Sequence, residues 1–130
     1  SWIKVPTNGN RVDVCAVQDF IIENAPEHAI IEEQHTRGRQ GGNITIGANF
    51  GRLTATLDLC GIPFVVVSPG DWQKHAGFHN GDTKEQAVFT CSAIGLPVPM
   101  TSNRKDARPH DGIADAWLIA AYGIEVAYND

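Results

Sequence analysis

The chain has 130 residues, of which 42% are hydrophobic and 19% are charged, as in a packed globular domain rather than a disordered chain. Its formal net charge of −5 argues against nucleic-acid binding over the whole surface, although it is compatible with a local basic patch. No apolar run approaches the roughly 18–20 residues that cross a bilayer, and the first residues lack the layout of a secretion signal.

The cysteines and the lack of linkers indicate one domain in a reducing compartment. Cys15, Cys60 and Cys91 form no CxxC pair and stand among apolar neighbours. An odd number of such residues is typical of buried free thiols in a cytoplasmic protein. No internal repeat, low-complexity tract or long linker interrupts the sequence, so residues 1–130 are predicted to form a single domain.

The first third of the chain predicts two strands and an amphipathic helix. Residues 2–5 can form a short strand that ends before Pro6, and residues 7–10 have the composition of a turn. A helix is expected over about residues 13–24, where apolar side chains recur at helical spacing. Residues 29–34 then predict a strand whose apolar start is buried and whose end is polar.

The middle of the chain predicts a basic loop, a long helix and a buried strand. The loop over residues 35–42 is rich in glycine and arginine. A helix is expected over about residues 44–59, with Asn43 as its N-cap and Gly61 just beyond its end. Residues 62–67 are continuously apolar, which is typical of a strand buried on both faces in a parallel sheet.

The last part of the chain predicts three helices and a proline-containing loop. Residues 69–76 resemble a short helix with proline in its first turn, and residues 82–85 match a capping box that opens a helix to about Ile94. A loop over residues 95–109 precedes a final helix over about residues 111–122. The alternation of strands and helices indicates an α/β layered domain with a mostly parallel sheet, although few strands are predicted for so many helices.

Two aspartates in the final helix are the sharpest local feature. Asp111 and Asp115 are four positions apart, so on a helix they share one face, with side chains roughly 5–6 Å from each other. Most other positions in this helix are apolar, so both acids point towards the core. Like charges on a buried face are costly unless a cation such as a divalent metal compensates them. Alternatively, Asp111 is only an N-cap and Asp115 pairs with an arginine.

A second pair of acids ends the strand over residues 29–34. Glu32 and Glu33 stand at the edge of the predicted sheet, where α/β domains build their sites. Because side chains alternate across a strand, only one of the two can face the aspartate-bearing helix, and the pattern does not say which. Two solvated acids at a strand end are the alternative interpretation.

Carboxylates without histidine or cysteine ligands suit hard cations such as Mg²⁺ or Mn²⁺. Two such ions about 3.5–4 Å apart activate a water and stabilise the leaving oxygen in phosphodiester hydrolysis. Cations that grip a nucleic-acid backbone would be needed nearby. No Asp or Glu lies between Gln34 and Leu57, where several arginines gather, and more cations follow later in the chain. The candidates are Arg37, Arg39, Arg52, Lys74, Arg104, Lys105 and Arg108.

Several segments recur together, in this order, in one known family. Residues 30–41 combine a strand, a glutamate and a loop containing Gly, Arg and Gln, and residues 50–52 spell Phe-Gly-Arg. Residues 59–74 give a strand followed by a Pro-x-x-Trp-x-Lys segment, and residues 84–85 and 104–116 complete the series. In order and spacing, from about residue 11 to 123, these segments resemble RuvC-type Holliday-junction resolvases, particularly the phage-type branch.

The resemblance implies an RNase H-like fold, a homodimer, Mg²⁺ or Mn²⁺ as cofactor, and cleavage of branched DNA at paired positions. It assigns the strand glutamate to Glu32 and the last two acids to Asp111 and Asp115, as metal-binding catalytic residues. It also places Lys105, Arg108 and His110 as candidates for contacting the scissile phosphate, with Lys105 counted among the catalytic residues. The expected DNA-binding residues are Arg37, Arg39, Arg52, Lys74, Arg104 and Arg108.

The sequence departs from the family at its beginning. The family opens with a strand that carries a metal-binding Asp in an Asp-x-Gly-like turn, whereas nothing here precedes Ser1 and Asp13 opens a helix. The chain is therefore expected to be N-terminally incomplete, lacking a strand of the sheet. Either further residues lie upstream in the natural protein, or this form is inactive.

Three functional hypotheses follow. The leading one is a metal-dependent, structure-selective DNA endonuclease in the cytoplasm of a bacterial or phage-infected cell. The second is a catalytically incomplete RNase H-like module that binds DNA or serves a structural role. The third, a nucleotide enzyme built on the Gly-rich loop over residues 37–42, is disfavoured because the loop lacks the GxxxxGK[ST] arrangement.

Overall fold

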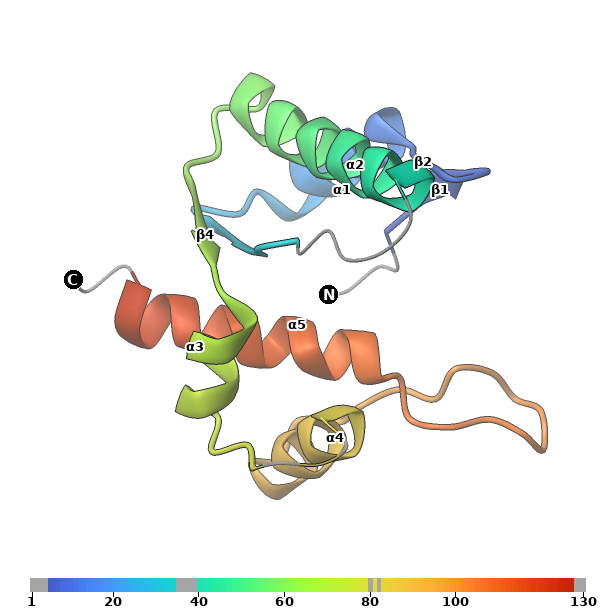
Figure 1. Ribbon diagram of the computed structural model, residues 1–130, viewed down its shortest axis with the longest axis vertical. Helices are drawn as coiled ribbons and strands as arrows, with labels where there is room; N and C mark the ends of the chain where they lie inside the picture. Colours follow the sequence, from blue (N-terminus) through green and yellow to red (C-terminus); the bar gives the residue numbers. More distant parts are fainter. Residues whose placement is uncertain (1–4, 35–39, 80, 82, 128–130) are drawn as a thin grey trace. The chain divides into compact units, whose positions relative to one another are not determined.

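The computed structural model describes residues 5–34, 40–79, 81 and 83–127. The chain forms two compact units, Ser1–Val65 and Val66–Asp130, which are described in turn below and drawn in Figure 1. The single domain predicted from the sequence stays a prediction. Among the described residues, no helix has the length and apolar character needed to span a membrane.

The first unit opens with a small antiparallel hairpin. Strand β1 (Thr7–Asn8) pairs with β2 (Arg11–Val12), with Thr7 opposite Val12. Gly9 adopts a φ of +63°, which glycine reaches without the steric strain of a side chain. The turn expected over residues 7–10 is therefore the centre and one strand of a hairpin. The strand expected over residues 2–5 lies outside the described residues, except for Val5, which is not in a strand.

Helix α1 (Val14–Asn24) has the predicted bounds because both of its ends are capped. The Asp13 carboxylate accepts a hydrogen bond from the backbone N–H of Ala16 at 3.1 Å, which satisfies a donor of the first turn. Ala25 ends the helix in the left-handed conformation, with its N–H donating to the carbonyl of Ile21. Ile21 is the buried anchor of this helix.

Helix α2 (Gln40–Leu59) begins earlier than the sequence predicts. Asn43 lies inside the helix, so the prediction that it is the N-cap is wrong. A capping side chain contributes only about 1 kcal/mol, and extending an existing helix by a turn is cheap compared with nucleating one. The C-terminal end is as predicted, since Gly61 adopts a φ of +70° just beyond it.

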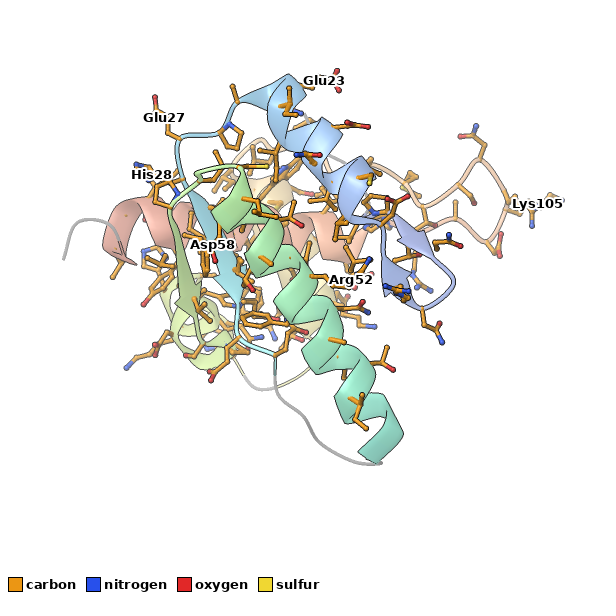
Figure 2. The ribbon with its side chains drawn as sticks, turned by 90° about the horizontal axis from the view of Figure 1, so that it is seen from above. Glu23, Glu27, His28, Arg52, Asp58 and Lys105 are labelled. Atoms are coloured by element: carbon orange, nitrogen blue, oxygen red, sulfur yellow. The ribbon has the colours of Figure 1, made fainter. Side chains whose placement is uncertain are left out.

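Side chains of α2 fasten this helix to the hairpin. Asn49 accepts a hydrogen bond from the N–H of Val12 at 3.0 Å and donates to the carbonyl of Asn10 at 2.8 Å. The Nε of Arg52 donates to the carbonyl of Val12 at 3.0 Å. Figure 2 shows Arg52 on α2. The backbone groups of buried Val12 are thus satisfied by side chains rather than by a further strand.

Strands β3 (Ala29–Glu32) and β4 (Phe64–Val67) are hydrogen-bonded neighbours in a second two-stranded sheet. Their pairing is preceded by a bond from the N–H of Ala29 to the carbonyl of Pro63 at 2.9 Å. The expectation that β4 is buried on both faces is wrong at Val66, which is 46% exposed. The buried apolar start expected for β3 is only half-buried. A short apolar run alone does not reveal how many layers cover a strand.

The first helix of the second unit is the short α3 (Pro69–His75), as predicted. Ser68 caps it by accepting from the N–H of Asp71 at 3.2 Å, and Pro69 occupies the first turn, where a missing N–H costs nothing. Trp72 is 1% exposed and meets the ring of Phe78 edge-on at a centroid distance of 5.5 Å. This aromatic pair anchors α3 in the core of the unit.

Helices α4 (Thr83–Ala93) and α5 (Asp111–Tyr122) form the main packed pair of the second unit (Figure 1). Both match the predicted bounds, although Asp82 of the expected capping box lies outside the described residues. Ala87 and Cys91 of α4 are completely buried, as is Ala114 of α5. The Cys91 thiol donates to the carbonyl of Ala114 at 3.6 Å. Small residues at the contact allow the two helices to approach closely.

A π-helical turn, η1 (Gly123–Ala127), continues α5 and was not predicted. Glu125 in this turn lies 3.0 Å from the Nε2 of His75 on α3. The ring of His75 also meets Tyr122 edge-on, with centroids 5.4 Å apart. Local sequence patterns do not distinguish a π turn from another turn of α-helix, because it depends on contacts of this kind.

The loop over residues 95–109 extends away from α4 and α5 (Figure 1) and is partly ordered by backbone pairing. Met100 and Pro109 form an antiparallel bridge, and the N–H of Thr101 donates to the carbonyl of Arg108 at 2.8 Å. Figure 2 shows Lys105 at the far end of this loop. The predicted loop is confirmed, with a short ladder at its base that holds the tip away from the helices.

All three cysteines are free, as expected, but only Cys91 is buried. Cys60 is half-buried, and Cys15 is exposed in the first turn of α1. Burial of Cys15 was inferred from apolar neighbours in sequence, yet on a helix adjacent residues point in different directions. The prediction of a buried thiol is therefore wrong at Cys15.

Candidate functional site

The start of α5 positions the first of the two aspartates. His110 is the N-cap, and its Nδ1 accepts a hydrogen bond from the N–H of Ile113 at 3.3 Å. Asp111 is the first residue of the helix rather than its cap, so the alternative interpretation of Asp111 as an N-cap is wrong. Asp111 is half-buried in the first turn of α5, where the helix dipole favours negative charge.

Asp115 follows one turn later and is also half-buried. The pKa of the Cys91 thiol on α4 is raised above its ordinary value of 9.0. Burial of the thiol is the larger cause, and the negative charge of Asp115 is the second. A second negative charge at Cys91 would be repelled by the carboxylate. The two aspartates therefore give α5 a negative stretch on an otherwise apolar helix.

The donor chemistry of these residues fits a hard divalent cation. Carboxylate oxygens are the ligands that Mg²⁺ and Mn²⁺ prefer, and Asp111 and Asp115 stand at positions that share one helix face. Within either unit, the described residues include no group of three His, Cys, Asp or Glu that could hold a metal ion. A metal site at Asp111 and Asp115 would need a further ligand.

The predicted third carboxylate, Glu32, is the last residue of β3 and is half-buried, whereas Glu33 is exposed. Glu32 belongs to the first unit, and both aspartates belong to the second. The three-carboxylate site therefore combines residues of both units, and it stays a prediction. The choice of Glu32 over Glu33 as a ligand stays a prediction as well.

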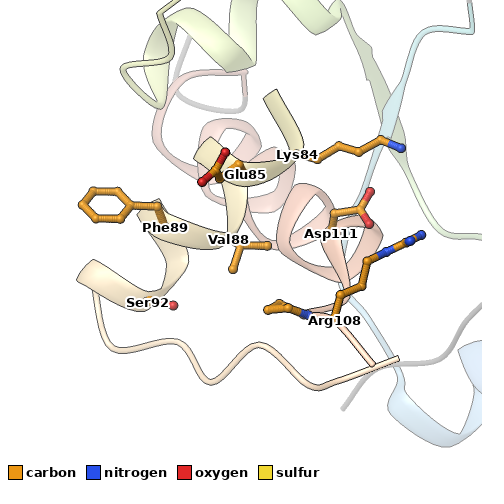
Figure 3. Close-up of a pocket in the computed structure, with 8 residues that line it drawn as sticks. Lys84, Glu85, Val88, Phe89, Ser92, Arg108 and Asp111 are labelled. Atoms are coloured by element: carbon orange, nitrogen blue, oxygen red, sulfur yellow. The ribbon is translucent and has the colours of Figure 1, made fainter. Parts of the chain in front are cut away.

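An open pocket of about 650 Å³ lies beside Asp111 in the second unit (Figure 3). Lys84, Asp111 and Arg108 gather at one end of it. Phe89 and Ser92 lie towards the other end, and Val88 lies between the two ends. One cavity therefore has a charged end and a more apolar end. Such a cavity suits a ligand with a charged group and a flat apolar part.

The predicted DNA-binding cations occupy different environments. Arg37 and Arg39 lie outside the described residues. Arg52 is half-buried, and its Nε already bonds to the carbonyl of Val12. Lys74 is exposed on α3 and lines a separate pocket of about 300 Å³. Arg52 and Lys74 belong to different units, so a basic surface shared by these residues stays a prediction.

The remaining predicted cations belong to the loop before α5. Arg104 and Lys105 are exposed near the tip of the loop, and Arg108 is at its base, where it lines the pocket beside Asp111. His110, also proposed to contact a phosphate, uses one ring nitrogen to cap α5. Of this group, the structure brings Arg108 into one cavity with a predicted metal ligand.

The pocket also contains residues that were not assigned to the site from the sequence. Lys84 and Glu85 were noted for their place in the family resemblance, but Val88, Phe89 and Ser92 were not singled out. One signal was available for Phe89. It lies midway between Ala87 and Cys91, which share the buried face of α4, so a helical projection places this large aromatic residue on the outer face.

No protein-family model matches the sequence, and no curated protein sequence matches it. Solved structures, in contrast, match over most of the chain. The arrangement of helices and strands is an RNase H-like α/β fold of the RuvC type, so the predicted fold class is confirmed.

Two of the matched structures are of RuvC from Thermus thermophilus. One superposes with a TM-score of 0.63 at 20% sequence identity, covering 88% of this chain and 66% of that one. Another, of T. thermophilus RuvC in complex with a Holliday junction substrate, gives a TM-score of 0.62 at 19% identity, covering 87% of this chain and 67% of that one. The chain thus spans about two thirds of the length of these proteins.

Proposed function

We propose that the protein is a metal-dependent, structure-selective DNA endonuclease of the Holliday-junction resolvase type. The observation that carries this proposal is the RuvC fold, matched over 88% of the chain, with one matched protein solved on a Holliday junction substrate. The pair of half-buried aspartates on α5 supports it, because carboxylates can hold the divalent cations that promote hydrolysis of a phosphodiester in a DNA strand.

In this proposal Asp111, Asp115 and Glu32 hold Mg²⁺ or Mn²⁺. When bound, such ions activate a water and stabilise the leaving oxygen. Lys105, at the exposed loop tip, contacts the phosphate to be cut, and Arg108 holds a neighbouring backbone phosphate beside Asp111. The remaining DNA-binding residues, Arg37, Arg39, Arg52, Lys74 and Arg104, contribute charge along the strands.

Branched DNA cut at paired positions implies two active sites, so we further propose that the protein works as a homodimer. We also propose that this activity belongs to the cytoplasm of a bacterial or phage-infected cell. Sedimentation of the purified protein at micromolar concentration should give the mass of two chains. A monomer that nonetheless cuts both strands of a junction would contradict the dimer.

The test of the activity is cleavage of a synthetic four-way junction with Mn²⁺ or Mg²⁺ by the protein together with any residues that its gene encodes before Ser1. Cleavage should be abolished in Asp115→Asn and Asp111→Asn, because an amide is a poorer metal ligand than a carboxylate. Asp19→Asn, an exposed aspartate on α1, is the matched control and should cut at the parental rate.

A gel-shift assay with the same junction separates the main alternative. An RNase H-like module that binds DNA without cutting it should shift the junction, in a salt-dependent manner, yet leave it intact with either metal. That outcome would reject the nuclease and support the non-catalytic module. Cleavage that survives both aspartate substitutions would reject the proposed metal ligands.

A further inference from the structure

The outer face of α4 carries an aromatic side chain that is not packed into the core. Phe89 is 74% exposed, while Ala87 and Cys91, two residues to either side, are completely buried. A single exposed apolar residue is ordinary on a protein surface. Phe89 differs in its setting, because it lines two adjacent pockets and so forms a wall between them.

These two pockets meet along α4. The first, of about 650 Å³, contains Asp111 and Arg108, and the second, of about 580 Å³, contains Phe78 and His79. Glu85, one helical turn before Phe89, lines both. The exposed ring of Phe89 therefore presents its surface to space wide enough for a small flat ligand.

The charges of the first pocket indicate which ligand that is. Figure 3 shows Lys84 and Arg108 on either side of Asp111 at one end, and Phe89 towards the opposite end. The pocket is lined by two cations and two carboxylates, so its formal charge is zero, and both cations stand at the Asp111 end. Glu85 lies on the side of the apolar end, where its oxygens can accept hydrogen bonds from amino groups.

A nucleotide has the matching arrangement. Its phosphate suits the Lys84 and Arg108 end, its base can stack on the ring of Phe89, and the exocyclic amino group of adenine, cytosine or guanine can donate to Glu85. A base inside a duplex has both faces covered by its neighbours, so only a base that has left the stack can lie against Phe89.

We propose that this pocket receives an unpaired nucleobase of a nucleic-acid strand, stacked on Phe89, while a phosphate of the same strand lies against Lys84 or Arg108. The inference rests on the proposed function, since it names the part of a branched DNA that the second unit binds. It adds to that function a preference for an unstacked base beside the aspartates of α5.

The test uses a single-stranded oligonucleotide containing one 2-aminopurine, and a second oligonucleotide of equal length in which that base is replaced by an abasic site. Stacking on Phe89 should quench the 2-aminopurine fluorescence on titration with the 130-residue chain. Phe89→Ala should weaken binding of the first oligonucleotide by roughly 5- to 150-fold, the range for loss of one stacked base. Its affinity for the abasic oligonucleotide should stay within twofold of the parental value.

Three variants control for other causes. Phe89→Trp should keep the quenching, because indole stacks as well as phenyl. Ile94→Ala, which removes an exposed apolar side chain just beyond α4 and outside the described lining of the pocket, should leave binding unchanged. Arg108→Gln should weaken both oligonucleotides equally. Phe89→Ala should have an unchanged Tm, since its side chain is exposed.

Equal effects of Phe89→Ala on the base-containing and abasic oligonucleotides, or no quenching by the parent chain, would overturn the inference. So would loss of quenching in Ile94→Ala, because the effect would then not be specific to the pocket. These outcomes are independent of the junction-cleavage assay. A nuclease that cuts junctions but does not quench the base keeps the proposed function and rejects only the base pocket.

Discussion

The Nδ1 atom of His110 accepts a hydrogen bond from the backbone N–H of Ile113 at 3.3 Å, and this bond begins α5 one residue before Asp111. The helix that carries both aspartates therefore starts on a histidine cap. Its position depends on a side chain that also belongs to the segment proposed to contact a phosphate. Stability and function can be separated at this residue by choosing substitutions that keep or remove the acceptor.

Replacing His110 with alanine should destabilise the protein by about 1 kcal/mol, the usual effect of losing a cap side chain. His110→Asn should recover most of that loss, because asparagine is a strong N-cap. Urea unfolding followed by circular dichroism measures both. Equal destabilisation by alanine and asparagine would show that the His110 ring acts through packing rather than through the cap.

Gly112→Ala sets two effects against each other. Alanine in place of glycine in a helix usually stabilises by about 0.5–1 kcal/mol. A Cβ at Gly112 would, however, stand 3.3 Å from Cε1 and 3.5 Å from Nδ1 of His110, pressing on the capping ring. The gain should therefore be smaller in the parent than in a His110→Asn background. A double-mutant cycle measures the difference, and perfect additivity would contradict this contact.

Arg52 is predicted to bind DNA, yet its Nε holds the carbonyl of Val12. Arg52→Met keeps much of the apolar stem and removes the donor, so it should destabilise by about 1–2 kcal/mol. If the rest of the guanidinium also contacts a DNA phosphate, the slope of the logarithm of the junction-binding constant against the logarithm of salt concentration should become smaller in magnitude by about one. Lys105→Met, at an exposed site, should change this slope in the same way. Its free energy of unfolding should stay within about 0.5 kcal/mol of the parent value. Destabilisation as large in Lys105→Met would contradict the structural role given to Arg52.

The raised pKa of the Cys91 thiol predicts how stability depends on pH under alkaline conditions. Between the ordinary value of 9.0 and the higher pKa of the folded state, the folded chain keeps a proton that the unfolded chain has lost. The contribution of this group is complete below about pH 9 and disappears as pH rises through the folded-state pKa. The free energy of unfolding should thus fall more gently above pH 9 in Cys91→Ser than in the parent.

Cys15→Ser is the matched control, because Cys15 is exposed and its replacement should leave the alkaline slope unchanged. Chemical denaturation at a series of pH values from 7.5 to 10.5 measures the slopes. An identical slope in parent and Cys91→Ser would reject the coupling between this thiol and folding.

The strongest sequence patterns predicted the elements that depend on short-range physics. The helix over residues 111–122 was predicted correctly, since its apolar residues recur at helical spacing, although a π turn continues it from Gly123. The earlier start of α2 was missed because glycine and asparagine there have weak helix propensity that the structure overrides. The β1–β2 hairpin was taken only as a turn, since strands of two residues leave almost no alternation to detect.

The candidate site was also predicted only in part. Asp111 and Asp115 were singled out because acids are rare in an apolar helix, and both are half-buried. Phe89 was missed because a phenylalanine in a helix is normally attributed to the core. Its exposure depends on which face of α4 packs against α5, and the small residues Ala87 and Cys91 mark that face only faintly in the sequence.

The π turn at the end of α5 bears on where the chain can change length. A π turn holds one more residue than an α turn, so a deletion within residues 123–127 can be absorbed by rewinding this turn as ordinary helix. A deletion between Asp111 and Asp115 has no such outlet and would rotate one aspartate relative to the other by about 100°. Natural length variation should therefore collect after Tyr122, at the expense of the Glu125–His75 pair, while the spacing between the aspartates stays fixed.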